Sequence, residues 1–153
     1  MPTKISLILH RIQEPIHLTL NRIVIAEDFQ DHGAALIEAA LNFDRVQAPL
    51  IGTGDRNVIK RIDIGGMSLA VKSFKQPNLI NRLVYRYWRK SKAHRSYLYA
   101  QRLFDLGIGT PKPVAFMESY SCGGIHRSFY FSLNVAADYT FRDLIHQPVL
   151  AHR

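Results

Sequence analysis

A lysine near the end of an apolar segment, preceded by a turn that carries two glycines, has the residue types that bind phosphate groups. Lys72 closes the run Ala70-Val-Lys, and Gly52 and Gly54 lie upstream in the turn 52–57. Glycine leaves backbone N–H groups open to an anion, and an ammonium supplies the opposite charge. Because a buried strand normally ends in an apolar residue, this lysine needs either solvent or an anion. A lysine that simply extends its amine into water is the alternative interpretation.

Cations are concentrated in one part of the chain. The formal net charge is +8, and no acid occurs between Asp63 and Asp105. An anionic partner is therefore expected for this segment: a nucleotide phosphate, a phosphorylated lipid surface or a nucleic acid. A solvated helix face that only aids solubility is the alternative. The residues expected to contact an anionic surface are Arg82, Arg86, Arg89, Lys90, Lys92 and Arg95.

Three antiparallel strands are expected to position the lysine and the glycines. Segment 58–64 alternates apolar and polar residues with the period of a strand, and Gly65-Gly66 is typical of a two-residue hairpin turn. The sequence therefore predicts a meander in which one loop carries glycines and the other turn is tight. The expected strands are residues 46–51, 58–64 and 67–74.

Helices and further strands are expected on either side of this meander. Apolar residues recur at helical spacing in several segments, and two apolar and aromatic runs are joined around Gly123-Gly124. Thr140 is a candidate cap for a further short helix. The expected helices are residues 28–41, 79–88 and 91–106, and the expected strands are 20–25, 114–120 and 128–135.

Length and composition indicate one globular domain. The chain has 153 residues, of which 47% are hydrophobic, which is enough for a core. A single cysteine, Cys122, cannot form an internal disulfide, so a reducing, cytoplasmic location is expected. Neither a signal peptide nor a membrane-spanning stretch is indicated. The histidines show no spacing that suits a metal and are expected at the surface.

Five short sequences follow one another along the chain: Arg56-Asn57, Val71-Lys-Ser-Phe-Lys75, Arg89-Lys-Ser-Lys-Ala93, Arg95-Ser-Tyr97 and Gly107-Ile-Gly-Thr-Pro-Lys-Pro113. In this order they resemble the lipopolysaccharide kinase family that phosphorylates Kdo or heptose in the inner core. The resemblance implies an α+β fold, the N-terminal lobe of a protein-kinase-like fold, with a five-stranded antiparallel sheet packed with helices after a short strand and helix. Residues 1–20 would be an extension, 21–147 the lobe, and 148–153 the tail where a C-terminal lobe would begin.

The resemblance also implies an ATP site. Lys72 would hold the α- and β-phosphates, backbone amides at Gly52 and Gly54 would approach them, and Asn57 would take the place of a third glycine. Ala70 would pack against the adenine. The backbone groups implied at the adenine edge are those of Leu133, Asn134 and Val135. An ordinary edge of a buried strand is the alternative for this last segment.

Two features depart from the family pattern. Leu98 stands where relatives carry the glutamate that pairs with the lysine, and no catalytic loop or metal-binding segment follows the strands. The family implies Mg²⁺ together with ATP, but no catalytic residue and no metal ligand is assigned in this chain. We therefore expect the chain to be inactive on its own.

Three classes of function stay open. The leading interpretation is the ATP-binding lobe of an enzyme that phosphorylates a Kdo or heptose sugar, with lipopolysaccharide or a lipid A precursor as its partner at the inner membrane face. The first alternative is a non-catalytic nucleotide-binding or regulatory module. The second is a nucleic-acid or anionic-surface binding protein, which predicts binding that weakens steeply with salt; nucleic acid is the less favoured partner.

Overall fold

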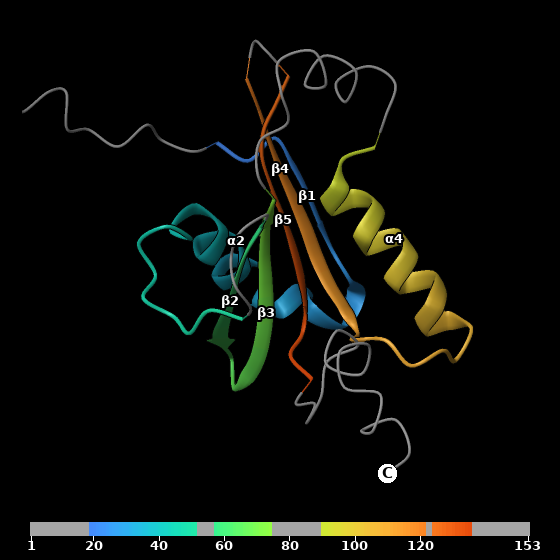
Figure 1. Cartoon of the computed structure of the whole chain (residues 1–153). Coiled ribbons are helices and arrows are strands. Elements are labelled where there is room, and N and C mark those ends of the chain that lie inside the picture. Colours follow the sequence, from blue (N-terminus) through green and yellow to red (C-terminus); the bar gives the residue numbers. More distant parts are fainter. Residues whose placement is uncertain (1–18, 52–56, 75–89, 122–123, 136–153) are drawn as a thin grey trace, which may run out of the picture.

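The computed structural model describes residues 19–51, 57–74, 90–121 and 124–135 and has an α+β fold. A five-stranded antiparallel sheet has the order β1-β4-β5-β3-β2, with helices on both of its faces (Figure 1). The expected fold class is confirmed. The elements in chain order are β1 (Arg22–Ile25), the 3₁₀ helix η1 (Glu27–His32), α2 (Gly33–Leu41), β2 (Asn57–Ile64), β3 (Met67–Phe74), α4 (Lys92–Asp105), β4 (Pro113–Ser121) and β5 (Gly124–Leu133).

The hairpin of β2 and β3 is set by its two-residue turn. Ile64 pairs with Met67, and the two residues between them, Gly65 and Gly66, have φ of +59° and +78°. Positive φ at both central positions gives a turn whose twist matches that of the flanking strands, and glycine adopts it without strain. The expected turn is therefore confirmed, and it fixes the register that carries Lys72.

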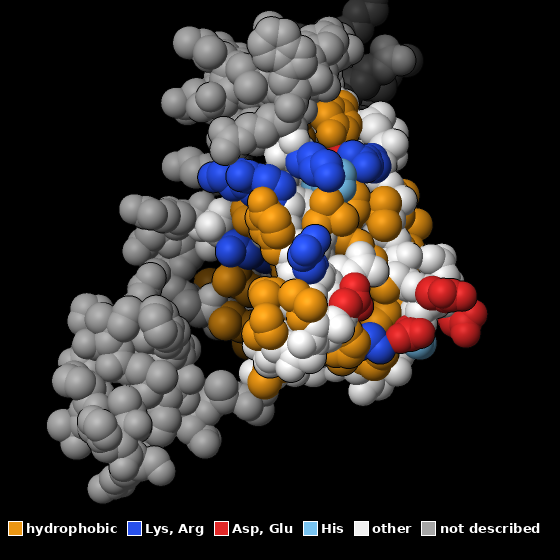
Figure 2. All heavy atoms as spheres, turned by 90° about the vertical axis from the view of Figure 1, so that its right-hand side faces the viewer, with side chains coloured by type: hydrophobic (Ala, Val, Ile, Leu, Met, Phe, Trp, Pro, Cys, Tyr) orange, Lys and Arg blue, Asp and Glu red, His pale blue; other side chains and the backbone are white. Residues whose placement is uncertain are grey.

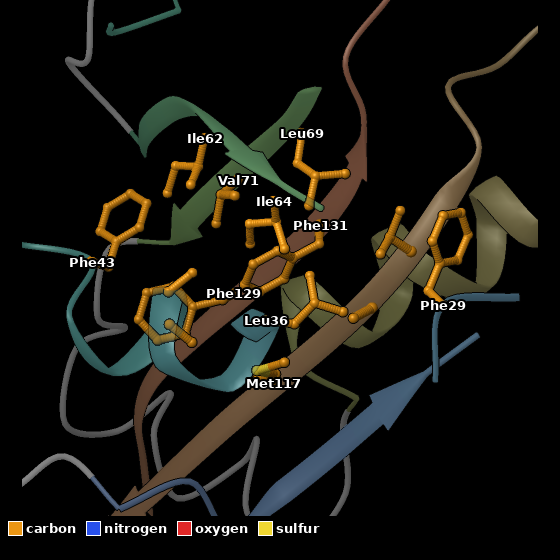
Figure 3. Close-up of a cluster of buried hydrophobic side chains, with 14 residues drawn as sticks. Phe29, Leu36, Phe43, Ile62, Ile64, Leu69, Val71, Met117, Phe129 and Phe131 are labelled. Carbon is orange, nitrogen blue, oxygen red and sulfur yellow. The ribbon is translucent and has the colours of Figure 1, made fainter. Parts of the chain in front are cut away.

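One face of the sheet packs against η1 and α2 and holds the larger core (Figure 3). Residues of β3 alternate between the two faces, and this face receives Leu69 and Val71, both fully buried. Phe129 of β5 lies 5.5 Å from Phe43, measured between ring centroids. Each buried side chain of this size contributes roughly 1.5–3 kcal/mol to folding. This core makes the sheet a rigid support for the opposite face.

The outer edge of β2 is covered by the segment before the glycine-bearing turn. Ile51 N–H donates to Ile59 O at 2.8 Å, and Arg61 N–H donates to Pro49 O at 2.9 Å. In place of the expected strand 46–51, the last residues of this segment make a short antiparallel pairing with β2. Lys60 of β2 also binds the chain that leads into this segment, because its Nζ donates to the carbonyl oxygens of Phe43 and Val46, each at 2.7 Å.

Helix α4 covers the opposite face of the sheet (Figure 1). It begins after Ser91, whose Oγ accepts a hydrogen bond from His94 N–H at 3.0 Å. Gly107 follows its end with a φ of +70°, as is common after helices. The expected helix 91–106 is confirmed. Ala93 and Tyr97 of the helix form a second buried cluster with Phe74 and Phe116 of the sheet. The partly buried residues beside this cluster are Val24, Ala26, Leu98 and Tyr130.

Three expectations on elements differ from the structure or lie outside it. The expected helix 28–41 is divided into η1 and α2 at Gly33. Strand β5 starts at Gly124, earlier than expected, because pairing with β4 continues from Arg127, past an irregularity at His126, to Ile125 and Gly124 at the tip of the hairpin. The expected helices at 79–88 and after 140, and the ends of the expected domain ranges, lie outside the described residues.

Candidate functional site

Lys72 projects from the sheet face that α4 partly covers. Leu69 and Val71 occupy the opposite core, so Ala70, Lys72 and Phe74 share the face toward α4. The Lys72 side chain is half-buried, and its Nζ lies 5.0 Å from the centroid of the Phe74 ring. The lysine is therefore a partly desolvated cation on a rigid strand.

The charge of Lys72 is not balanced by an acid in the part of the chain that the structure describes. Burial lowers the pKa of Lys72 from 10.5, and the positive charge of Lys92 lowers this pKa further. The ion pairs among the described residues involve other cations, namely Arg22, Lys112 and Arg127. A cation that is partly removed from water beside a second cation favours the binding of an anion.

Leu98 occupies the helix position at which the family resemblance implies a carboxylate partner for Lys72. It lies in α4 and packs, partly buried, on the cluster that contains Phe74 and Phe116. An apolar side chain at this position contributes to the seat of α4 on the sheet and offers no charge to Lys72. The sequence-based interpretation that Leu98 replaces the carboxylate of the family stays a prediction.

The other residues expected at an ATP site are distributed as follows. Ala70 pairs with Arg61 of β2 on one side and Ser132 of β5 on the other, and Asn57 is the half-buried first residue of β2. Gly52 and Gly54 lie outside the described residues. Ala70 is therefore next to the Lys72 position on the same face, where it would meet a planar ligand.

The expected adenine edge has most of its amides already engaged. Leu133 N–H donates to Lys112 O, and Asn134 N–H donates to Ser68 O, both at 2.9 Å. The side chain of Leu133 packs against the larger core on the far side of the sheet. Val135, the remaining residue of this segment, is 59% exposed.

Two residues of this face were missed by the sequence analysis. Ile59 of β2 and Tyr130 of β5 are the cross-strand neighbours of Lys72. Burial, only partly offset by a hydrogen bond with Ser132, raises the pKa of Tyr130 to about 12. Tyr130 therefore stays a neutral hydroxyl at physiological pH. The period-2 alternation of β2 could have identified Ile59, whereas Tyr130 needed the register of β5.

The residues expected to contact an anionic surface divide into two groups. Arg82, Arg86 and Arg89 lie outside the described residues. Lys90 and Lys92 are exposed beside the start of α4, and Arg95 is half-buried. Figure 2 shows lysine and arginine side chains interleaved with apolar ones over the face that carries α4, with acidic side chains gathered at one edge. Cationic side chains spread over one face in this way attract anions.

His94 corrects the expectation that the histidines are surface residues. It is 7% exposed, and its ring stacks on Phe116 with 4.6 Å between centroids. Arg22 NH1 lies 3.3 Å from Nδ1, in position to donate to it. Burial lowers the pKa of His94 from 6.5, and the nearby charge of Arg22 lowers it further. The position is explained by the helix register, which places this residue toward the sheet.

A buried carboxylate lies beside this histidine. Glu118 of β4 is fully buried, 3.8 Å from Arg22 NH1, and its Oε2 accepts a hydrogen bond from the Tyr120 hydroxyl at 2.8 Å. Burial, and then the Glu118 hydrogen bond and charge, raise the pKa of Tyr120 to about 12. Among the described residues Oε1 of Glu118 has no hydrogen-bond partner. This polar group lies between α4 and β1.

Acidification is expected to weaken the folded state through His94. Above pH 6.5 the imidazole is neutral in both states, and its contribution to stability is complete. As the pH falls below 6.5 the unfolded chain takes up the proton first, so the free energy of unfolding falls until the lowered pKa of the folded state is passed. Urea unfolding between pH 7.5 and 5.5 measures this loss. His94→Gln is expected to flatten this part of the profile, and parallel profiles would contradict the assignment.

The described residues include no group of three or more His, Cys, Asp and Glu side chains that could hold a metal ion. The same part of the chain contains no helix with both the length and the apolar character needed to span a membrane. On the face toward α4, Lys72 thus places a half-buried ammonium two residues from the small apolar side chain of Ala70.

The sheet order, the hairpin that carries Lys72 and the helix on the same face define an α+β fold of the kinase small-lobe type. No protein-family model matches the chain, and no curated protein matches it. A solved structure, described as WaaP in complex with acyl carrier protein, is similar with a TM-score of 0.50 and 20% sequence identity. The match covers 83% of this chain and 48% of that chain, so this chain spans about half the length of its structural neighbour. The likeness concerns the fold alone.

Proposed function

We propose that this chain is the ATP-binding small lobe of a lipopolysaccharide kinase-like protein. In the complete enzyme the phosphoryl group would pass from ATP to a Kdo or heptose sugar of the inner core. The proposal is supported by the fold and, above all, by Lys72, which is half-buried without a carboxylate among the described residues. An ammonium in this state gains more from a phosphate than a fully hydrated one does.

Each described residue of the face has a part in this proposal. Lys72 would bind the phosphates, and Ala70 would lie under the adenine, with Ile59 closing the apolar floor beside the lysine. Val135 would offer its amide to the edge of the base. Mg²⁺ would neutralise phosphate charge in the complete enzyme, and no described residue is assigned to hold it. The lipid-linked sugar would approach along the cationic face of Figure 2.

ATP is expected to bind the 153-residue chain about a hundredfold more tightly than adenosine, because the phosphate contact with Lys72 is charge-assisted. Isothermal titration with the two ligands measures the ratio. Equal affinities would contradict the assignment of Lys72, and the lack of saturable ATP binding would contradict the proposed function. The sugar acceptor is tested separately by mass spectrometry of lipopolysaccharide from a strain without the gene, where loss of a phosphate on Kdo or heptose is expected.

A non-catalytic nucleotide-binding module is the second candidate, and Leu98 favours it. Kinases use a helix carboxylate to hold the lysine in place, and Leu98 packs in an apolar cluster instead. A misplacement of about one ångström can reduce a rate on the order of a hundredfold. Retained ATP binding with unchanged lipopolysaccharide phosphorylation in the deletion strain would support this candidate. Tight oligonucleotide binding that ATP does not displace would instead favour a nucleic-acid function.

A further inference from the structure

The outward side of α4 and the turn after it carry large apolar side chains in water. Tyr99 and Leu106 are each 64% exposed, and Leu103 is 38% exposed. Phe104, near the end of the helix, is 47% exposed, and Ile108 in the following turn is 51% exposed. None of the five belongs to either core cluster. Exposed apolar side chains gathered on one element mark an interaction surface.

Helical spacing places three of these side chains in one row with three cations. Residues at intervals of three and four lie on the same side of a helix. This row, the outer stripe, consists of Lys92, Arg95, Tyr99, Arg102, Leu103 and Leu106. The buried residues Ala93, Tyr97 and Ala100 lie on the opposite side, against the sheet. Asp105 lies beside the stripe, about a quarter of a turn round the helix, so the stripe itself contains no acid.

The cations of the outer stripe are available to an external anion. The ion pairs among the described residues use Arg22, Lys112 and Arg127, which are not in the stripe. The buried Nε of Arg95 has no hydrogen-bond partner in the part of the chain that the structure describes. Three positive charges with no acid between them are complementary to an anionic surface.

The apolar end of the stripe has a fixed shape. Ile108 N–H donates to Leu103 O at 2.9 Å, and Gly107 N–H donates to Phe104 O at 3.0 Å. These two bonds close the helix around Gly107, whose φ is +70°. The Nζ of Lys112 lies 5.6 Å from the centroid of the Phe104 ring. The apolar side chains are therefore presented without further ordering of the backbone, which keeps the cost of binding low.

We propose that the outer stripe binds an anionic membrane surface, with its apolar side chains entering the boundary between headgroups and acyl chains and its cations contacting lipid phosphates. Helix α4 is the outermost element on its side of the molecule (Figure 1), and a flat lipid surface accepts a convex helix without a matching groove. A nucleic acid would satisfy the cations but leave Leu103 and Leu106 in water. This inference goes beyond the proposed nucleotide site and does not depend on it.

Sedimentation with lipid vesicles tests the inference on the 153-residue chain. Vesicles of equal parts phosphatidylglycerol and phosphatidylcholine are expected to bind it at least about tenfold more strongly than vesicles of phosphatidylcholine alone. The double variant Leu103→Ser with Leu106→Ser is expected to weaken binding to the anionic vesicles about tenfold. Arg102→Gln is expected to weaken it about fivefold. Thermal unfolding confirms that each variant is folded.

Matched controls change the same residue types elsewhere on the molecule. Leu41, at the end of α2 on the other face of the sheet, and Leu50, beside β2, are 41% and 61% exposed, close to the values of Leu103 and Leu106. Leu41→Ser with Leu50→Ser is the control for the apolar side chains, and Arg45→Gln, at another exposed arginine, is the control for the charge. Both controls are expected to change vesicle binding about twofold or less.

The outcomes distinguish a membrane from other occupants of the stripe. Equal binding to the two kinds of vesicle, or equal losses in the stripe variants and their controls, would overturn the inference. Binding that depends on Arg102 but not on the two leucines would show adsorption by charge alone and would also overturn it. A dimer that the double leucine variant dissociates, in a chain that ignores vesicles, would assign the stripe to a second copy. Vesicle binding without ATP binding would remove the proposed function and leave this inference standing.

Discussion

Lys72→Met is expected to reduce the affinity of the chain for ATP about a hundredfold while the ligand-free protein stays as stable as the wild type or becomes more stable. The loss of affinity follows from the charge-assisted contact, which contributes about 1.5–3 kcal/mol and leaves a phosphate facing an apolar group when it is removed. Isothermal titration measures the affinity, and urea unfolding measures the free energy of unfolding.

The expected effect of Lys72→Met on the free energy of unfolding follows from the environment of the Lys72 charge in the folded state. In the folded state burial and Lys92 both oppose the charge of Lys72, so its pKa is lowered from 10.5. At pH 7 the unfolded chain holds this proton without that penalty, and folding is disfavoured by the charge. As the pH rises through the lowered pKa toward 10.5 the penalty disappears. Methionine removes it at every pH and keeps the packing of the aliphatic stem on Phe74.

The control is Arg127→Met, which removes a cation that pairs with Asp44 near the tip of the β4–β5 hairpin, away from Lys72. This variant is expected to bind ATP normally. If Lys72→Met unfolds the protein or lowers its stability by more than about 1 kcal/mol, the lysine has a structural role that the described contacts do not contain. If ATP affinity is unchanged, the amine does not meet the phosphates.

The local elements of this fold were predictable because their signals lie within a few residues of each other. Gly65-Gly66 at positive φ, and the cap at Ser91 with the stop at Gly107, are read directly from residue types. These signals predicted the elements, and the fold class followed from the order of the elements through the resemblance to the kinase small lobe.

The remaining features depend on contacts between distant segments. The sequence predicted a strand at β1 but not its pairing with β4, which sets Arg22 opposite Glu118. Buried His94 and Glu118 are each polar residues that carry no local sign of burial. Tyr130 joins the candidate site through the register of β5 alone.

Arg22→Met is expected to lower the free energy of unfolding by about 2–3 kcal/mol, a large loss for one residue at the surface. Its partner Glu118 is fully buried, whereas the Arg22 side chain is 47% exposed. Removal of the arginine leaves a buried carboxylate with one hydrogen bond, from Tyr120, and no cation at ion-pair distance among the described residues. Because Arg22 is itself half-exposed, the expected loss in the free energy of unfolding is smaller than for a fully buried ion pair. Urea unfolding at pH 7 measures it.

Arg127→Met is the matched control, because it breaks an ion pair whose carboxylate, Asp44, is 69% exposed. A loss of at most about 1 kcal/mol is expected there, since water replaces the partner. Comparable losses in the two variants would contradict the expected role of burial.

A double-mutant cycle identifies the charge as the cause. Glu118→Gln alone is expected to cost about 1 kcal/mol, and the same change in the Arg22→Met protein is expected to restore about 1 kcal/mol, because it removes a charge that has lost its partner. Additive losses would instead assign the effect of Arg22→Met to its contacts with His94 and the Phe116 ring. In either case the seat of α4 on the sheet is tested. If the charge is the cause, the ion pair between Arg22 and Glu118 helps to hold α4 on the sheet, because Arg22 also contacts His94 of that helix.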